Sequence, residues 1–226
     1  MATGKGLFGS SIARKYWMAL TGLFLCSFLV IHLLGNIPLM LGHQDDFNLY
    51  ARFMTTFPVI KAVSYLLYAS FVVHAVDGIL LMRQNAAARP VKYAAYNGAA
   101  NASWSSRNMG LLGVFTLVFI VVHLKSFWYE MHFGKIPVYI YEDGTELKDL
   151  YTLTVTAFQE LWYTVFYVVS MALLGLHLWH GFSSAFQSLG LTHPKYTPMI
   201  KIAGAFFALV IPAVFAAIPV VIYLAS

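Results

Sequence analysis

Five of the eight histidines in this sequence fall inside long apolar runs, where water cannot satisfy an imidazole. His32, His74 and His123 each stand alone in such a run, while His177 and His180 share a fourth one. A neutral imidazole in a membrane acts as a hydrogen-bonding group or as a metal ligand through a ring nitrogen. A lone histidine of this kind is more often a packing or proton-relay residue. The arrangement of all five therefore decides between these roles.

The composition restricts the classes of protein to which the chain can belong. Of its 226 residues, 60% are hydrophobic and 10% are charged, and the mean hydropathy is +0.71. Soluble domains carry about 25% charged residues, so ordinary soluble, disordered and fibrous proteins are excluded. The single cysteine, Cys26, excludes a disulfide framework and a cysteine-rich zinc site. The net charge of +5 is small and dispersed, which argues against nucleic acid as a partner.

The apolar runs predict an all-α integral membrane protein. A spanning helix needs about 20 apolar residues, and five stretches meet this requirement. The sequence thus predicts one domain over residues 1–226, built as a bundle of five transmembrane helices. Segment 83–107 is expected to be a loop, and segment 134–149 a short hairpin or turn. The predicted spans are Tyr16–Met40, Val59–Met82, Met109–Trp128, Leu161–Phe186 and Met199–Leu224.

The charges outside these spans predict the orientation of the chain. Lys and Arg are enriched in cytoplasmic loops. Nine basic residues fall on the side of the N-terminus, whereas the other side has five, mixed with eight acidic residues. This asymmetry predicts a cytoplasmic N-terminus and an external C-terminus. The nine basic residues are Lys5, Arg14, Lys15, Arg83, Arg89, Lys92, Arg107, Lys195 and Lys201.

The direction of each span sorts the histidines by depth. Spans one and three run outward, so His32 and His123 are expected near the external face. Spans two and four run inward, so His74 and His180 are expected near the cytoplasmic face. We call His32 and His123 the outer pair, and His74 with its partner on span four the inner pair.

Two imidazoles from facing helices at one depth are the ligand set of a bis-histidine haem. An internal repeat supports the outer pair, because segment 23–33 aligns without gaps with segment 114–124 and brings His32 and His123 into register. A Cys-x-x-Cys-His motif is absent, so the haems would be b-type. Zinc or copper would need three or four ligands at one depth. The pattern therefore predicts a helical bundle that encloses two stacked haems b.

The inner pair leaves a choice between two residues on span four. His177 and His180 lie on nearly one face of a helix, about 4.5 Å apart along its axis. His74 stands nine residues before Arg83, while His180 stands ten and His177 thirteen residues before Gly190. Matched depth favours His180 as the ligand, with His177 as the runner-up.

Five short stretches of the chain occur together in one family of membrane proteins. They are Arg14–Phe24, His32–Asn36, Phe47–Tyr50, Ser105–Gly110 and His180–Phe186. With them, the chain resembles the dihaem cytochrome b membrane subunits of succinate dehydrogenases and fumarate reductases over essentially its whole length. By position, the resemblance implies His32 and His123 as ligands of the distal haem, and His74 and His180 as ligands of the proximal one. A glycine follows the family's ligand on the fourth helix, as Gly181 follows His180.

The resemblance also implies partners and a location. It implies a flavoprotein subunit with covalent FAD and an iron–sulfur subunit with three clusters, both docked on the cytoplasmic face of the bacterial inner membrane. It implies menaquinone as the quinone, bound near the outer haem, and it admits a dimer of heterotrimers. The basic segments Lys5–Lys15 and Arg83–Arg107 are expected to contact the iron–sulfur subunit, although lipid headgroups would attract the same charges.

The chain departs from some menaquinol-oxidising relatives at two places. Those relatives have a Glu just before span two and another Glu two residues before the fourth-helix ligand. This chain has Met54 and Leu178 at the corresponding positions. The proton handling of those relatives is therefore not carried over.

Further residues are expected to bind the edge of the haem and the quinone. Haem propionates need cationic donors at the membrane edge, and a quinone needs a hydrogen-bond donor beside apolar walls. The same residue types also anchor helices at any membrane interface. The propionate candidates are Arg14, Lys15, Arg83 and Arg107, and the quinone candidates are Asn36, His43, Asn48, Tyr50, Arg52 and Phe127.

Two other functions share part of this pattern. A dihaem cytochrome b of a formate dehydrogenase or hydrogenase would need the same four ligands. A transporter with a histidine proton relay would combine histidines with carboxylates, whereas Asp77 is the clear intramembrane acid of this chain. The direction of the reaction, succinate oxidation or fumarate reduction, stays open because both use the same parts.

Overall fold

The computed structural model describes residues 11–88 and 102–225 as a bundle of long helices. Five of the helical segments are long and apolar enough to cross a membrane, which confirms the predicted all-α membrane fold. The five segments are α1 (Ser11–Leu41), α3 (Pro58–Ala87), α5 (Met109–His123) continued by η3 (Leu124–Tyr129) and α6 (Glu130–Phe133), α8 (Leu161–Ser188) and α9 (Thr197–Leu224).

The described helices run further than the predicted spans. The third one continues past Trp128 to Phe133 through a π-helical turn, and the second one continues past Met82 to Ala87. The predicted loop 83–107 therefore begins and ends in helix, since α4 occupies Trp104–Arg107, while residues 89–101 lie outside the described residues.

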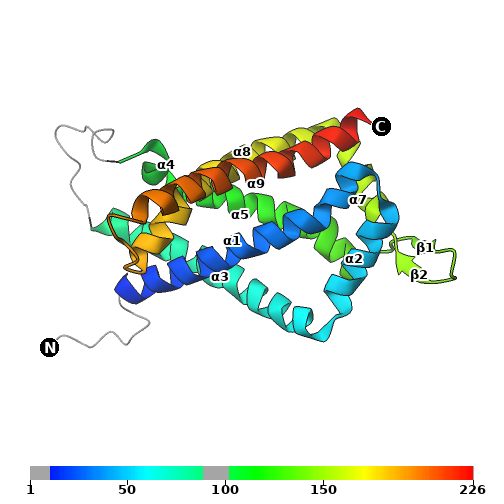
Figure 1. The fold of residues 1–226 in the computed structure, drawn as a ribbon, viewed down its shortest axis with the longest axis horizontal. Helices are drawn as coiled ribbons and strands as arrows, with labels where there is room; N and C mark the ends of the chain where they lie inside the picture. Colours follow the sequence, from blue (N-terminus) through cyan, green and yellow to red (C-terminus); the bar gives the residue numbers. More distant parts are fainter. Residues whose placement is uncertain (1–10, 89–101, 226) are drawn as a thin grey trace.

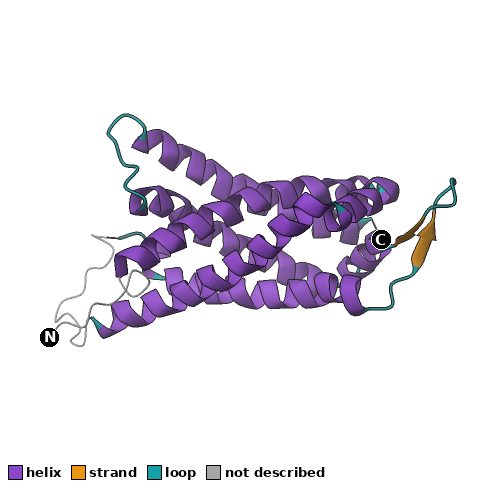
Figure 2. Ribbon diagram, turned by 90° about the horizontal axis from the view of Figure 1, so that it is seen from below, coloured by secondary structure: helices purple, strands orange, loops and turns teal. Residues whose placement is uncertain are grey.

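Three short elements gather at one end of the bundle, opposite the end where α1 begins and where α4 lies (Figure 1). They are α2 (Gln44–Thr56), α7 (Leu150–Phe158) and a hairpin of β1 (Val138–Ile140) with β2 (Glu146–Lys148). The hairpin pairs Val138 with Lys148 in antiparallel register, as predicted for this segment. It projects beyond the helices (Figure 2).

The helices pack tightly where their side chains are small. α8 packs along α9 and also contacts α1 and α5. A Cβ atom added at Gly175 would lie 3.0 Å from the carbonyl oxygen of Ala208, so the glycine lets α8 and α9 approach closely. The outward face of α9 exposes Ile202, Phe206 and Leu209, an apolar stripe suited to lipid.

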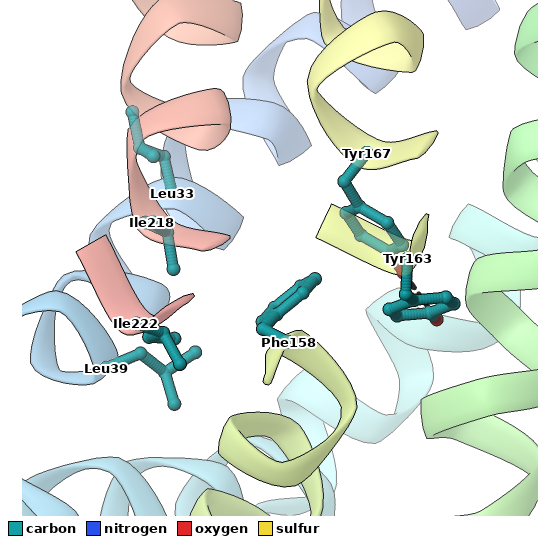
Figure 3. Packing of buried hydrophobic residues seen from close by; sticks show 7 residues of the cluster. All are labelled: Leu33, Leu39, Phe158, Tyr163, Tyr167, Ile218 and Ile222. Carbon is teal, nitrogen blue, oxygen red and sulfur yellow. Dashed lines mark hydrogen bonds between the residues drawn. The ribbon is translucent and has the colours of Figure 1, made fainter. Parts of the chain in front are cut away.

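The largest buried cluster lies at the end of the bundle that carries α7. Phe158 of α7 packs there against two tyrosines of α8, Tyr163 and Tyr167 (Figure 3). Leu33 and Leu39 of α1 and Ile218 and Ile222 of α9 complete the cluster. This core holds α1, α8 and α9 around the region that contains the outer pair of histidines.

Candidate functional site

The outer pair of histidines meets across the bundle as the sequence predicts. The rings of His32 on α1 and His123 on α5 have centroids 5.7 Å apart and planes at 90°. Phe28 stacks on His32 with centroids 5.0 Å apart, and Phe215 of α9 lies on another side. The two imidazoles therefore face each other within apolar and aromatic walls.

The inner pair is formed by His74 and His177. Their ring centroids are 6.3 Å apart and their planes make an angle of 70°. No ring contact joins His74 to His180 among the residues that the structure describes. The ring opposite His74 is thus that of the runner-up, His177, and not that of His180. Which of the two binds a metal stays a prediction.

Helix register explains why counting from the helix ends favoured the other residue. His74 and His177 are each the seventeenth residue of their helix, since α3 begins at Pro58 and α8 at Leu161. The two helices end at different points beyond the histidines, because α3 has 30 residues and α8 has 28. Distances measured from Arg83 and Gly190 therefore compared unlike positions.

The internal repeat extends to the inner pair and selects the same residue. A shift of 91 positions relates Gly22 to Gly113 as it relates His32 to His123. A Cβ atom at Gly22 would lie 3.2 Å from Cε1 of His74, and one at Gly113 would lie 3.8 Å from Cε1 of His177. The two halves of the molecule thus make the same glycine–histidine contact.

A second contact repeats in the same way. A shift of 103 positions relates His74 to His177 and Gly78 to Gly181, so each histidine is followed by glycine one turn later. A Cβ atom at Gly78 would lie 3.5 Å from Cε of Met18, and one at Gly181 would lie 3.3 Å from Cε of Met109. Met18 and Met109 are themselves 91 positions apart. The shift of 103 positions relates His180 to Asp77 and not to His74.

The two pairs stand at different heights in the bundle. Gly22, which touches His74, precedes His32 by ten residues on α1, or about 15 Å along the helix axis. Four of the described histidines therefore form two facing pairs stacked along the bundle.

The separations within the pairs match two imidazoles on one metal atom. A metal–imidazole bond is about 2 Å long and the ring nitrogen lies about 1 Å from the ring centre, so opposed ligands have centroids about 6 Å apart. The observed separations are 5.7 Å and 6.3 Å. Within the described ranges, no three side chains of His, Cys, Asp and Glu come together as a metal site. The donor set is thus one of imidazole pairs, and it fits bis-histidine ligation.

The surroundings of the inner pair can adapt to a flat ligand. Met18 and Met109 lie against Gly78 and Gly181, and Met82 lies against Gly110. Methionine is flexible and fills irregular space, while glycine has no side chain and lets another group approach the helix backbone closely. Gly35, which the sequence places one turn after His32, instead packs under the ring of Tyr50 from α2.

Hydroxyl groups at Nδ1 orient two of the four rings. The Thr21 hydroxyl lies 3.1 Å from Nδ1 of His74, and the Tyr167 hydroxyl lies 3.0 Å from Nδ1 of His123. The Asn36 side-chain nitrogen donates to the carbonyl oxygen of His32 at 2.7 Å and lies 3.5 Å from Nδ1 of that residue. Among the described residues, Nδ1 of His177 is buried and has no partner. A hydrogen-bond acceptor at Nδ1 leaves Nε2 free to bind a metal.

Two of the predicted quinone candidates, Asn48 and Tyr50, are engaged in packing α2. Asn48 is 2% exposed and donates to Asp149 at 3.2 Å, while its side-chain oxygen accepts from the backbone N–H of Tyr151 at 3.0 Å. Tyr50 packs against Gly35. His43 lies 3.2 Å from a carboxylate oxygen of Asp46. The contacts of Asn48 and Tyr50 hold α2 across the end of α1.

Two further quinone candidates and the four propionate candidates lie elsewhere in the bundle. Phe127 lies in the buried aromatic cluster with His123, Tyr163 and Tyr167. Arg52 is exposed on α2. The propionate candidates lie at the opposite end of the bundle from α2, with Arg14 half-buried and the others exposed; these others are Lys15, Arg83 and Arg107.

Asp149 is the anchor of the α2 end of the molecule. Its carboxylate accepts from Gln44 at 3.0 Å, from Asn48, and from the backbone N–H of Thr152 at 3.1 Å, which caps α7. Burial tends to raise the pKa of the Asp149 carboxyl, but these hydrogen bonds outweigh it and hold the pKa below its usual value. The carboxylate therefore ties α2 to α7 in its charged form.

Several residues of the site carry no strong signal in the sequence. Thr21, Tyr163 and Tyr167 are ordinary residues of an apolar helix until the fold brings them to a histidine. Gly22 and Gly113 could have been found by extending the repeat one residue toward the N-terminus. The segments expected to dock a partner, Lys5–Lys15 and Arg83–Arg107, lie partly outside the described residues.

Comparisons with protein-family models, with curated proteins and with solved structures found no match for this chain.

Proposed function

We propose that this protein is a dihaem cytochrome b that carries electrons across a membrane, as the anchor subunit of a succinate:quinone oxidoreductase or fumarate reductase. The observation that supports the haems is the repeated geometry of two facing histidine pairs. His32 faces His123 and His74 faces His177, with centroid separations that suit one metal atom between each pair. The assignment to this enzyme class rests on the motifs of the sequence.

The residues of each pair would bind through Nε2. When bound, a haem supplies reversible one-electron transfer. The chain itself excludes water from the sites with the aromatic rings around His32 and His123 and with the methionines near His74 and His177. The hydroxyls of Thr21 and Tyr167 hold the ring orientation of two of the four ligands. His180 takes no ligand role in this proposal.

The two ends of the bundle would serve different partners. At the end with α4, cationic residues such as Arg14, Arg83 and Arg107 would bind haem propionates and attract the iron–sulfur and flavoprotein subunits. At the end with α2, menaquinone would bind beyond the outer pair. Arg52 is the quinone candidate whose charged group is exposed there, while Phe127 offers an aromatic wall.

The experiment that tests this function uses the complex isolated from its membrane with the partner subunits retained. Addition of a menaquinol analogue, or of succinate through the flavoprotein, should reduce b-type haem, seen as an α-band in the visible spectrum. A split α-band would report two distinct sites. A colourless, fully folded preparation would exclude the proposal and favour a role without haem, such as histidine-relay transport.

A further inference from the structure

The two histidines of the inner pair are equivalent in the repeat but differ in what meets their Nδ1 atoms. His74 has the Thr21 hydroxyl at 3.1 Å from Nδ1. The residue 91 positions after Thr21 is Leu112, and Nδ1 of His177 is buried without a partner among the described residues. The replacement of a hydroxyl by an isobutyl group accounts for this difference.

The hydrogen bonds around Thr21 fix the tautomer of His74. The Thr21 hydroxyl donates its single proton to the carbonyl oxygen of Trp17 at 2.6 Å. The oxygen can then only accept from His74, so the proton of the neutral imidazole resides on Nδ1. Nε2 then keeps its lone pair and is free to bind a metal.

His177 has no equivalent constraint. Leu112 is 1% exposed and offers no acceptor, although it lies on α5 at the repeat position of Thr21. Gly113 beside it touches Cε1 of the His177 ring, as Gly22 touches that of His74. The rings of His74 and His177 therefore have similar positions in the fold, but only Nδ1 of His74 has a hydrogen-bond partner among the described residues.

We infer that Thr21 is a positioning residue of the inner site and that Leu112 makes His177 the weaker axial donor of the pair. This inference rests on the proposed function, because it takes His74 and His177 as ligands of one haem. An acceptor at Nδ1–H makes a ligating imidazole more basic. A more basic ligand stabilises the oxidised metal and lowers its midpoint potential. Thr21 therefore lowers the potential of the inner haem, and Leu112 keeps it higher than two matched ligands would.

The test exchanges the two residue types in the intact complex and measures both haems by potentiometric titration and low-temperature EPR. Thr21→Val, which removes the hydroxyl at nearly constant shape, should shift the inner haem to a higher potential. Leu112→Thr, which supplies an acceptor to His177, should shift it to a lower one. The outer haem should keep its potential and its EPR signal in both variants.

Thr116→Val is the matched control. Thr116 stands on α5 and donates to the carbonyl oxygen of Leu112 at 2.9 Å, in the way that Thr21 donates to Trp17. No contact with a histidine is described for it, so its removal should leave both potentials unchanged.

A conservative variant separates positioning from packing. If Thr21→Val loses the inner haem, Thr21→Ser should retain it with the potential of the unaltered protein, because the hydroxyl is kept. Loss of the haem in Thr21→Ser as well would assign Thr21 a packing role and overturn the inference. Unchanged potentials in both Thr21→Val and Leu112→Thr, with two haems bound, would also overturn it. Absence of haem from the unaltered protein would instead refute the proposed function.

Discussion

Nδ1 of His123 lies at the start of a chain of buried hydroxyl groups. Tyr167 lies 3.0 Å from this atom, and its hydroxyl lies 3.1 Å from that of Tyr163 one turn earlier on α8. If Nε2 of His123 binds a metal, Nδ1 carries the proton, so Tyr167 accepts from His123 and donates to Tyr163. The direction of this chain therefore follows from ligation, and Tyr167 holds the ring of the outer ligand.

Removal of the Tyr167 hydroxyl should perturb the outer site alone. Tyr167→Phe leaves a buried Nδ1–H without its acceptor, which costs about 1–3 kcal/mol. We expect a higher potential and an altered EPR signal for the outer haem, with the inner haem unchanged. Tyr68→Phe is the control, because its hydroxyl accepts from Trp128 at 2.9 Å and has no hydrogen bond to a histidine in the described part of the chain. Equal shifts of both haems, or none in either, would contradict the assignment.

The choice between His177 and His180 can be decided by the haem content of two single variants. His177→Ala should lose the inner haem and keep the outer one, because it removes the ring opposite His74. His180→Ala, three residues away on the same helix, should keep both. The haems are counted in the purified protein by absorbance of the extracted pigment. Loss of the inner haem in His180→Ala alone would restore the ligand that helix-end counting favoured.

At the scale of elements, α2 was the least predictable part of the fold. The predicted spans leave residues 41–58 without an assigned element, and the structure forms there a helix that lies across the bundle end. Its most buried residue is Asn48, which is polar, so a search for apolar periodicity does not detect the contact face. Only the acceptor on Asp149, about 100 residues later, explains why an asparagine is buried there.

The long helices were predictable because membrane spans leave a direct compositional signal. All five were expected within a few residues of their starts, and the repeat placed His32 opposite His123. On α8, depth counted from the helix ends points to His180, whereas the ring beside His74 is that of His177. Counting from Pro58 and Leu161 instead gives His74 and His177 the same place in their helices. The hydroxyl partners were not predictable, since they depend on the rotation of one helix against another.

Loss of the Asp149 carboxylate should loosen α2 from α7. Asp149→Ala removes the cap of α7 and the partner of Asn48, at a cost of about 1–3 kcal/mol. Hydrogen exchange of the α2 amides should become about tenfold faster for each ~1.4 kcal/mol lost. Asp143→Ala is the control, because the hydrogen bond that the described residues give this exposed carboxylate comes from Thr145, within its hairpin turn. Equal effects of the two variants would contradict the anchoring role.

The same contact should weaken in acid. Because the folded-state pKa of Asp149 lies below its usual value, the contact stabilises the fold above that usual value. This contribution is lost as the pH falls through the lowered pKa. At each pH, the exchange rate is compared with the intrinsic rate of an unfolded peptide, because the intrinsic rate itself falls in acid. The protection of the α2 amides should decrease on acidification in the unaltered protein and change less in Asp149→Ala.

At the scale of the whole molecule, the repeated contacts describe a bundle of two similar halves. α1 with α3 and α5 with α8 each place a glycine against a histidine and a methionine against a glycine. α9 covers one side and exposes an apolar stripe. The histidine pairs are about 15 Å apart along the axis, which suits a path for electrons through a membrane about 30 Å thick.

The predicted orientation can be tested with single cysteines, since the chain has one native cysteine, Cys26. In a Cys26→Ser background, Lys135→Cys should react with a membrane-impermeant thiol reagent in intact cells. Arg107→Cys should react only after the membrane is opened. The reverse pattern would place the N-terminus outside and contradict the rule of positive charge inside.

The central claim is that each of the two histidine pairs binds one haem. The most direct measurement is the number of haem groups per polypeptide in the purified protein, together with the axial-ligand signature in low-temperature EPR. The account predicts two haems b per chain, both with bis-histidine ligation, and one haem remaining in His32→Ala. A folded protein with no haem, or with a single haem that survives both His32→Ala and His177→Ala, would contradict it.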